Sequence, residues 1–87
     1  MRYKIVVCMQ GFVLVGVLED DHEQGIVFSR AAVIRQWGTT KGLGELADGP
    51  TSKTITDLIP QRTKVERRNI IYDFEARGWD KRMGDDA

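Results

Sequence analysis

Three apolar runs near the start of the chain predict an antiparallel meander. Residues 3–9 and 12–18 are rich in valine and other β-branched residues, and a glutamine and a glycine separate them. Residues 26–36 form a third run, which follows an acidic stretch that ends in glycine, as expected of a hairpin loop. Gly16 interrupts the second run and indicates a sharp bend or a bulge there.

The pattern changes after residue 36. Residues 37–54 contain four glycines and a proline but few residues that favour a strand. A loop of this length inside so small a domain is usually functional or disordered. Within it, residues 43–47 predict one or two helical turns, and residues 54–59 predict a short strand.

Residues 65–75 predict the last strand, after a turn at Pro60. Ile70 and Phe74 are four residues apart, so a helix over residues 65–76 is the alternative. The Ile-Ile-Tyr run and the surrounding strands favour the strand. We expect residues 1–76 to form a single domain and residues 77–87 a charged tail, with its beginning docked through Trp79.

Composition places the chain among ordinary globular domains. It has 87 residues, of which 41% are apolar and 30% are charged. A chain this short buries only about 60% of its unfolded surface, so we expect a homo-oligomer. Thirteen basic residues balance thirteen acidic ones, which leaves no overall positive field for nucleic acid and no polybasic segment for a membrane.

The apolar segment at the N-terminus is interrupted at residues 10–11 and is followed by acidic residues from position 19. This pattern is too broken for a signal peptide or a membrane span, which needs roughly twenty apolar residues. We therefore expect a cytoplasmic protein that does not enter a membrane.

Few residues offer catalytic or metal chemistry. Cys8 lies in an apolar run, where a thiol is usually inert, and the single histidine, His22, lies in the acidic loop. One cysteine and one histidine cannot complete a zinc site without carboxylates or a second chain. The sequence therefore predicts a protein that is not an enzyme, with no cofactor, no metal site and no catalytic residues.

The glycine-rich loop is the best candidate for a binding site. Its backbone amides, hydroxyls and ammonium groups are those that bind phosphate, although the order of a P-loop is absent. Trp37 can stack on a flat base or, alternatively, cap the core. The candidate ligand-binding residues are Arg35, Trp37, Gly38, Thr39, Thr40, Lys41, Gly42, Thr51, Ser52 and Lys53. An alternative site for RNA is Arg67, Arg68 and Asn69.

Two segments carry a resemblance to Sm-like proteins. Gly16-Val-Leu with Asp20 and the strand over residues 26–34 resemble their first motif, and residues 65–72 resemble the second. This chain departs from the Sm-like pattern at two places. Arg68 stands where the second motif usually has a glycine, and residues 37–54 are longer than the variable loop that connects the two motifs in that family. The resemblance implies a mainly β fold: a small, strongly bent, antiparallel five-stranded Sm/SH3-like barrel with a long loop that carries one short helix.

A second resemblance rests on the segment from Trp37 to Gly49, with Leu43-Gly-Glu-Leu-Ala inside it. It is similar to short phage-encoded proteins, a class that includes oligomeric sponges which sequester the cyclic nucleotides of bacterial immunity. The resemblance implies a non-enzymatic anti-defence protein that binds a small anionic nucleotide, most specifically a cyclic oligonucleotide. The alternatives are an Sm-like ring that binds single-stranded RNA, and an inhibitor or assembly factor that binds a protein partner.

Overall fold

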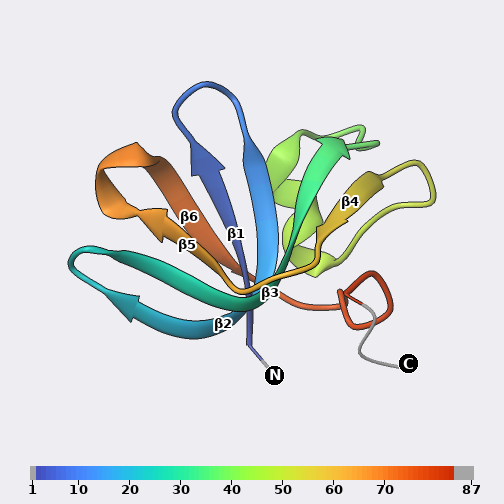
Figure 1. Cartoon of the computed structure of the whole chain (residues 1–87). Helices are drawn as coiled ribbons and strands as arrows, with labels where there is room; N and C mark the ends of the chain where they lie inside the picture. The colour runs from blue at the N-terminus through green and yellow to red at the C-terminus, as the bar shows by residue number, and fades with distance from the viewer. Residues whose placement is uncertain (1, 84–87) are drawn as a thin grey trace.

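The computed structural model describes residues 2–83, which form six strands and two short 3₁₀ helices (Figure 1). The strands are β1 (Tyr3–Cys8), β2 (Val13–His22), β3 (Gly25–Gln36), β4 (Ile55–Ile59), β5 (Thr63–Glu66) and β6 (Ile70–Ala76). The helices are η1 (Leu43–Asp48) and η2 (Arg67–Asn69). The protein is therefore mainly β, as predicted, and η1 confirms the predicted helical turns.

The strands make one antiparallel sheet in the order β4-β3-β2-β1-β6. β3 is long enough for two neighbours on the same side: its first half pairs with β5, from Gly25 to Phe28, and its second half pairs with β4, from Ala31 to Gln36. β4 and β6 stand at the two ends of the path and do not pair with each other, so the sheet formed by the described residues is not closed.

The predicted count of five strands is wrong, because the strand expected over residues 65–75 is divided. It begins as β5, turns through η2 and continues as β6. The helical alternative for this segment is also wrong. β5 was hard to foresee, since in Thr-Lys-Val-Glu only Val65 is apolar and buried.

The bend predicted at Gly16 is confirmed and has a steric cause. A Cβ atom at this position would lie 2.5 Å from the Phe28 ring and 2.8 Å from the Arg30 backbone oxygen. The pairing of β2 with β3 shifts register just beyond it, between Val17 and Asp20. Glycine therefore lets the Phe28 ring pack directly against the backbone of β2 where the sheet bends.

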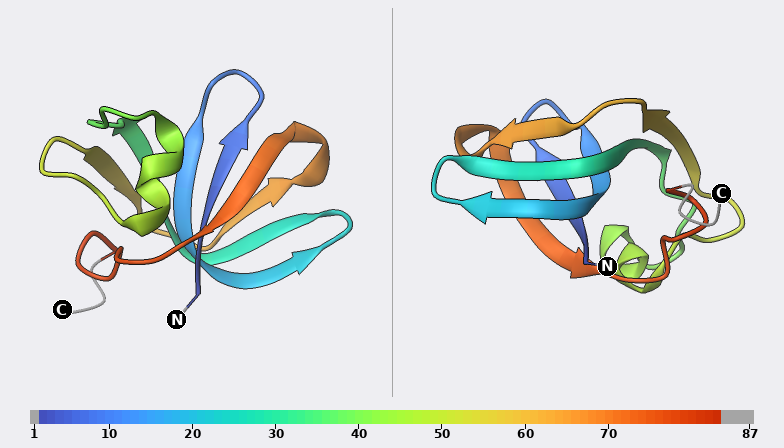
Figure 2. Two further views of the ribbon diagram at one scale, coloured as in Figure 1. Left: turned by 180° about the vertical axis from the view of Figure 1, so that it is seen from behind. Right: turned by 60° about the horizontal axis from the view of Figure 1, so that its bottom comes forward.

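Each face of the sheet buries its own apolar cluster, because side chains alternate along each strand. On one face, Tyr3 and Ile5 of β1 pack with residues of η1 and the C-terminal segment; we name this the loop-side core. On the other face, Val6 and Cys8 pack beneath β5 and the first half of β3; we name this the strand-side core. Figure 2 shows η1 and the C-terminal segment on the same side of the sheet.

Residues beyond β6 contribute to the loop-side core. Trp79 and Met83 are fully buried, and the Trp79 indole donates a hydrogen bond to the Leu46 backbone oxygen, 3.0 Å away. Arg82 donates to the backbone oxygens of Thr54 and Thr51. Residues 84–87 of the expected tail lie outside the described residues. Within residues 2–83 no helix is long and apolar enough to cross a membrane.

Candidate functional site

The structure brings the two halves of the predicted binding loop together. The Thr51 hydroxyl donates to the Gly38 backbone oxygen at 2.7 Å, and the Thr54 hydroxyl donates to the Trp37 backbone oxygen at 2.6 Å. Gly38 has a φ of 68°, and a Cβ there would lie 2.4 Å from the Lys53 carbonyl carbon. The segments around Gly38 and Lys53 therefore lie side by side, as a nucleotide site built from both would require.

The polar groups of this loop are, however, bound within the protein. Glu45 Oε1 accepts hydrogen bonds from the backbone amides of Thr40 and Lys41, at 3.3 and 3.1 Å. The Thr51 and Thr54 hydroxyls bind backbone oxygens, and Arg35 Nε lies 2.8 Å from Asp57 Oδ2. A phosphate at these amides would first have to displace the Glu45 carboxylate.

Three groups of the predicted loop stay accessible. Trp37 is 42% exposed, so it does not cap the core, and Lys41 and Lys53 are exposed and form no ion pair within residues 2–83. None of the three hollows described below is lined by these residues. These residues thus offer an aromatic surface and two cations of the same loop, outside these three hollows.

The two arginines of the alternative site in η2 have different environments. Arg67 Nη2 donates to Asp21 and to the His22 backbone oxygen, and Arg67 Nη1 lies 3.5 Å from Asp73. Arg68 is exposed and lies 2.9 Å from Glu66. Arg67 is therefore mainly a structural group, whereas Arg68 remains accessible.

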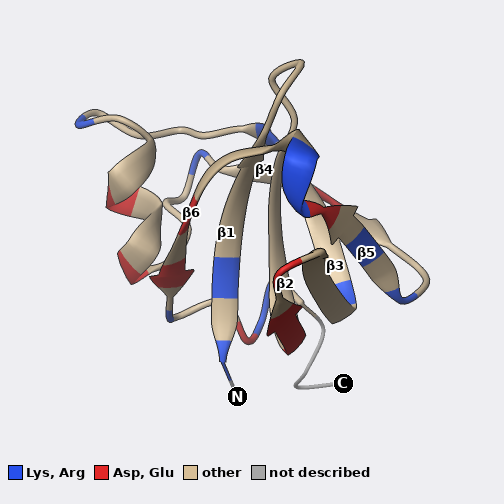
Figure 3. Ribbon diagram, turned by 90° about the vertical axis from the view of Figure 1, so that its left-hand side faces the viewer, with Lys and Arg blue, Asp and Glu red and all other residues tan. Residues whose placement is uncertain are grey.

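Arg67 belongs to a charged network that we name the Lys4 cluster. Lys4 Nζ lies 2.9 Å from Asp21, 3.0 Å from Asp73 and 3.7 Å from Glu75, so one ammonium joins β1 to β2 and β6. Figure 3 shows the basic band on β1 beside acidic bands on its neighbours. Burial alone would lower the pKa of Lys4, but the hydrogen bonds to Asp21 and Asp73 outweigh it and raise that pKa. The cluster holds the strands together and offers no unbalanced charge.

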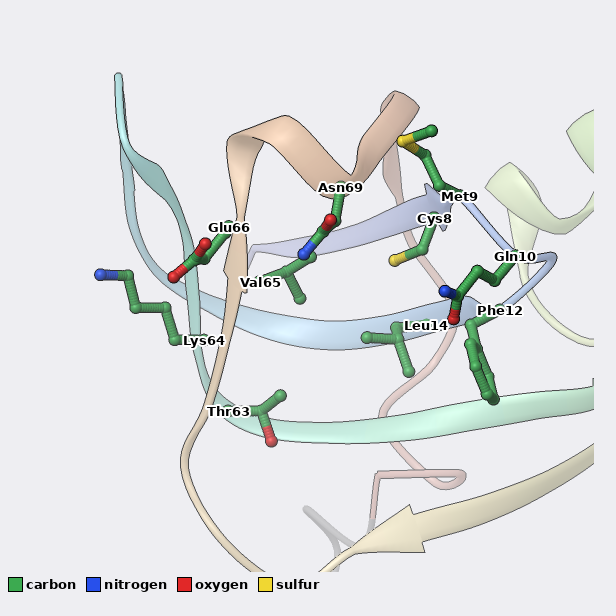
Figure 4. A pocket seen from close by; sticks show the side chains of 10 residues that line it. All are labelled: Cys8, Met9, Gln10, Phe12, Leu14, Thr63, Lys64, Val65, Glu66 and Asn69. Atoms are coloured by element: carbon green, nitrogen blue, oxygen red, sulfur yellow. The ribbon is translucent and has the colours of Figure 1, made fainter.

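A concave site lies beside β5, and we name it the β5 hollow (Figure 4). It has a volume of about 560 Å³. Its floor is apolar and belongs to the strand-side core, while Thr63, Lys64 and Glu66 of β5 form one wall. Its lining residues are Cys8, Met9, Gln10, Phe12, Leu14, Thr63, Lys64, Val65, Glu66 and Asn69.

The groups that could bind a ligand enter the β5 hollow from two separate segments. Gln10 and Phe12 come from the turn between β1 and β2, and Asn69 comes from η2; Figure 4 shows the Gln10 and Asn69 side chains on two sides of the hollow, with Cys8 between them in this view. The two segments are tied together, because the Met9 amide donates to the Asn69 backbone oxygen at 2.8 Å. Phe12 is 57% exposed, which leaves its ring open to a ligand.

Gln10 adopts a backbone conformation that glycine or asparagine usually supplies. Its φ is 77°, and it is the non-glycine residue with a positive φ among those described. The tight turn imposes this value: the Cys8 amide donates to the Phe12 oxygen, and the Gly11 amide donates to the Cys8 oxygen. A left-handed conformation costs about 1–2 kcal/mol for such a residue. A glutamine kept at this cost points to a use for its side chain.

Cys8 lies on the floor of the β5 hollow. Burial raises the pKa of its thiol above the ordinary value of 9.0. The thiol therefore stays protonated at neutral pH and acts as an apolar part of the lining.

Two further hollows lie nearby. One, of about 500 Å³, shares Lys64 and Glu66 with the β5 hollow, so the two adjoin at β5; its other lining residues are Glu23, Gln24, Arg67 and Arg68. The other, of about 510 Å³, is lined by residues of β3, β4 and the following turn, with Met83. In residues 2–83 no group of three or more His, Cys, Asp or Glu side chains is placed to hold a metal ion.

Comparisons of the chain with protein-family models, with curated proteins and with solved structures found no match. Sequence reasoning included Asn69 only as part of an RNA site and missed Gln10 and Phe12. The Gln-Gly pair between two valine-rich runs is the signal that could have identified them, since a turn residue other than glycine or asparagine before a glycine is unusual.

Proposed function

We propose that this protein is a non-enzymatic nucleotide-binding protein that holds a base in the β5 hollow. The observation that carries the proposal is that two carboxamides, of Gln10 and Asn69, and the exposed Phe12 ring line one hollow with an apolar floor. Ligand pockets commonly have volumes of about 300–1,000 Å³ and combine apolar walls with a few polar groups. At about 560 Å³ the β5 hollow lies within that range.

The lining chemistry suits a nucleobase. Each carboxamide, of Gln10 and of Asn69, has both donors and an acceptor, as the edge of a base does. The Phe12 ring can stack on the face of the base, and such stacking is worth about 1–3 kcal/mol.

The rim supplies a cation for the phosphate. Lys64 lines the β5 hollow and makes no ion pair within residues 2–83. The neighbouring Glu66 carboxylate is paired with Arg68, which offsets its charge. An anionic nucleotide thus has one available ammonium beside the site of its base.

The finer parts of the proposal come from the sequence resemblances. We propose that the nucleotide is a cyclic oligonucleotide signal, that the protein sequesters it in the host cytosol as a phage-encoded sponge, and that it does so as a homo-oligomer. We also propose that the sheet is an incomplete barrel of the Sm/SH3 type. The strongly bent β3 and the short helix η2 between the last two strands support this assignment.

A panel of ligands tests the proposal. The purified chain is titrated by calorimetry and by thermal shift with cyclic di- and trinucleotides, linear mononucleotides and short single-stranded RNA. A ligand at one hundred times its dissociation constant stabilises the native state by about 2.7 kcal/mol. We expect a nucleotide to bind and to be recovered intact; a panel in which none binds would overturn the proposal.

One variant separates the site from the fold. Gln10→Gly removes the carboxamide but suits the left-handed backbone, so the fold is expected to keep its stability while binding is lost. Asn69→Ala provides a second test, because its backbone oxygen still accepts from Met9. Gln61→Ala, an exposed amide outside the β5 hollow, is the matched control and should bind normally. Trp37→Ala should also bind normally; if it alone loses binding, the site lies in the predicted loop.

Single-stranded RNA binding is the second candidate function. The hollow that contains Arg68 adjoins the β5 hollow through Lys64, so a strand could cross β5 with a base on one side and a phosphate on the other. This function predicts affinity that falls steeply with salt and that is weakened by Arg68→Ala. A mononucleotide that binds as tightly as RNA, with weak salt dependence, would argue against it.

A further inference from the structure

β4 has an unpaired outer edge. It stands at the end of the strand order and pairs only with β3, so within residues 2–83 the backbone groups on its other side have no strand partner (Figure 1). Such an edge is a template for another strand unless charged residues, proline or a bulge protect it. The strand reads Ile-Thr-Asp-Leu-Ile; its one charged side chain, Asp57, is paired with Arg35, and it contains no proline. The edge therefore carries no unpaired charge and remains open to pairing.

Apolar side chains flank this edge on both faces of the sheet. Ile55 and Leu58 are exposed, and because their positions differ by three residues they point to opposite faces. Trp37 lies near the start of β4. Its backbone oxygen accepts a hydrogen bond from the hydroxyl of Thr54, the residue that directly precedes the strand. A strand added along β4 would cover apolar surface on both sides as well as satisfy the backbone.

The sequence of β4 favours a second copy of this chain as the added strand, because its apolar residues stand at both ends. Asp57 is at the centre of the five residues, and Arg35 Nε on β3 lies 2.8 Å from its carboxylate. In a two-fold antiparallel pair centred on Asp57, Ile55 of one copy faces Ile59 of the other. The two Asp57 carboxylates then meet at the axis, each already neutralised by its own Arg35. The strand is thus complementary to itself in length and in its apolar ends, and the two Arg35–Asp57 pairs offset the repulsion between the like charges at the axis.

We infer that the protein forms a two-fold dimer in which β4 pairs with β4 of a second copy and the two sheets become one. This inference is independent of the nucleotide proposal, because the β5 hollow contains no residue of β4. It specifies an isologous contact: the same edge serves both copies, so assembly stops at two.

Sedimentation equilibrium of the full chain and its variants tests this dimer. We expect the unaltered chain to be dimeric and Leu58→Lys to be monomeric, because an unpaired charge on an edge strand blocks pairing, unlike Asp57, which Arg35 neutralises. Ile71→Lys, at an exposed apolar position on the opposite terminal strand β6, is the matched control and should stay dimeric. A monomeric unaltered chain, or dissociation by Ile71→Lys but not by Leu58→Lys, would overturn the inference.

A charge pair provides a second test that does not depend on the folding of the lysine variant. Arg35→Ala leaves two unneutralised Asp57 carboxylates at the axis and should weaken the dimer by about tenfold or more. Adding Asp57→Asn to this variant removes the repulsion and should restore most of the lost affinity. An Arg35→Ala chain that dimerises as well as the unaltered chain would contradict the two-fold axis at Asp57.

Discussion

Lys4 Nζ lies 2.9 Å from Asp21 Oδ2, which joins the first strand to the far end of the second across a mostly buried ion pair. The same ammonium contacts Asp73 on β6, so it connects three neighbouring strands. Lys4→Met removes the charge that both carboxylates share and should lower the free energy of unfolding by about 1.5–3 kcal/mol. Urea denaturation followed by circular dichroism measures this loss. An unchanged midpoint would show that the cluster is not structural.

Acid should weaken the fold through Asp21. Hydrogen bonds from Lys4 and then Arg67 hold the pKa of this carboxyl below its ordinary value of 3.8. The unfolded chain therefore takes up the proton first, and stability that is present above about pH 4 is lost as the pH falls through the lower folded value. Asp21→Asn should flatten the acid side of the stability profile. Glu23→Gln, a nearby position with no ion pair within residues 2–83, should leave it unchanged.

Arg67 and Arg68 of η2 should contribute differently to the free energy of unfolding. Arg67→Ala breaks contacts with Asp21, Asp73 and the His22 backbone oxygen, and we expect it to cost about 1.5–3 kcal/mol. Arg68 is exposed and its pair with Glu66 is a surface pair, so Arg68→Ala should change stability by less than about 0.5 kcal/mol. Equal effects would contradict the different environments assigned to them.

Gly38 should be intolerant of any side chain. Its φ is 68°, and a Cβ atom would meet the Lys53 backbone at 2.4 Å, so Gly38→Ala should destabilise the protein by about 2–4 kcal/mol. Gly44 in η1 is the matched control, because nothing lies within 4 Å of a Cβ there. Gly44→Ala should be neutral or stabilise slightly, by up to about 1 kcal/mol. Thermal unfolding of both variants compares the two positions.

Trp79 should contribute to stability through both its volume and its indole nitrogen. Trp79→Ala leaves a cavity in the loop-side core and should cost about 3–5 kcal/mol. Trp79→Phe keeps an aromatic ring but removes the indole hydrogen bond to the Leu46 backbone oxygen, which still accepts from the Gly49 amide at 3.1 Å, so this variant should cost only about 0.5–1.5 kcal/mol for the lost hydrogen bond. Similar losses in the two variants would show that the volume does not matter.

The alternation and clustering of apolar residues were enough to predict most strands, the helical turns at Leu43–Asp48 and the bend at Gly16. These features depend on the order of residues within short segments, so they can be predicted from one sequence. β5 escaped prediction because it has one buried apolar residue and owes its place to pairing with the first half of β3. Long-range pairing of this kind leaves no periodic pattern in a short segment.

The candidate site was harder to predict for the same reason. The loop amides and hydroxyls have the composition of a phosphate site, but the sequence could not show that Glu45, Trp37 and Gly38 already supply their partners. Conversely, the β5 hollow joins a turn at residues 9–12 to η2 nearly sixty residues later, and only the folded chain brings Gln10 and Asn69 to one place.

The most direct test of the account is a nitrogen–proton NMR titration of the isotopically labelled chain with a bound nucleotide from the ligand panel. We predict that the largest shifts fall on the backbone amides of Gln10 and Phe12 and on the Asn69 side-chain amide, and that Gln10→Gly abolishes them. Shifts confined to residues 37–42 and 51–53, with the β5 hollow unaffected, would contradict the central claim that the base binds beside β5.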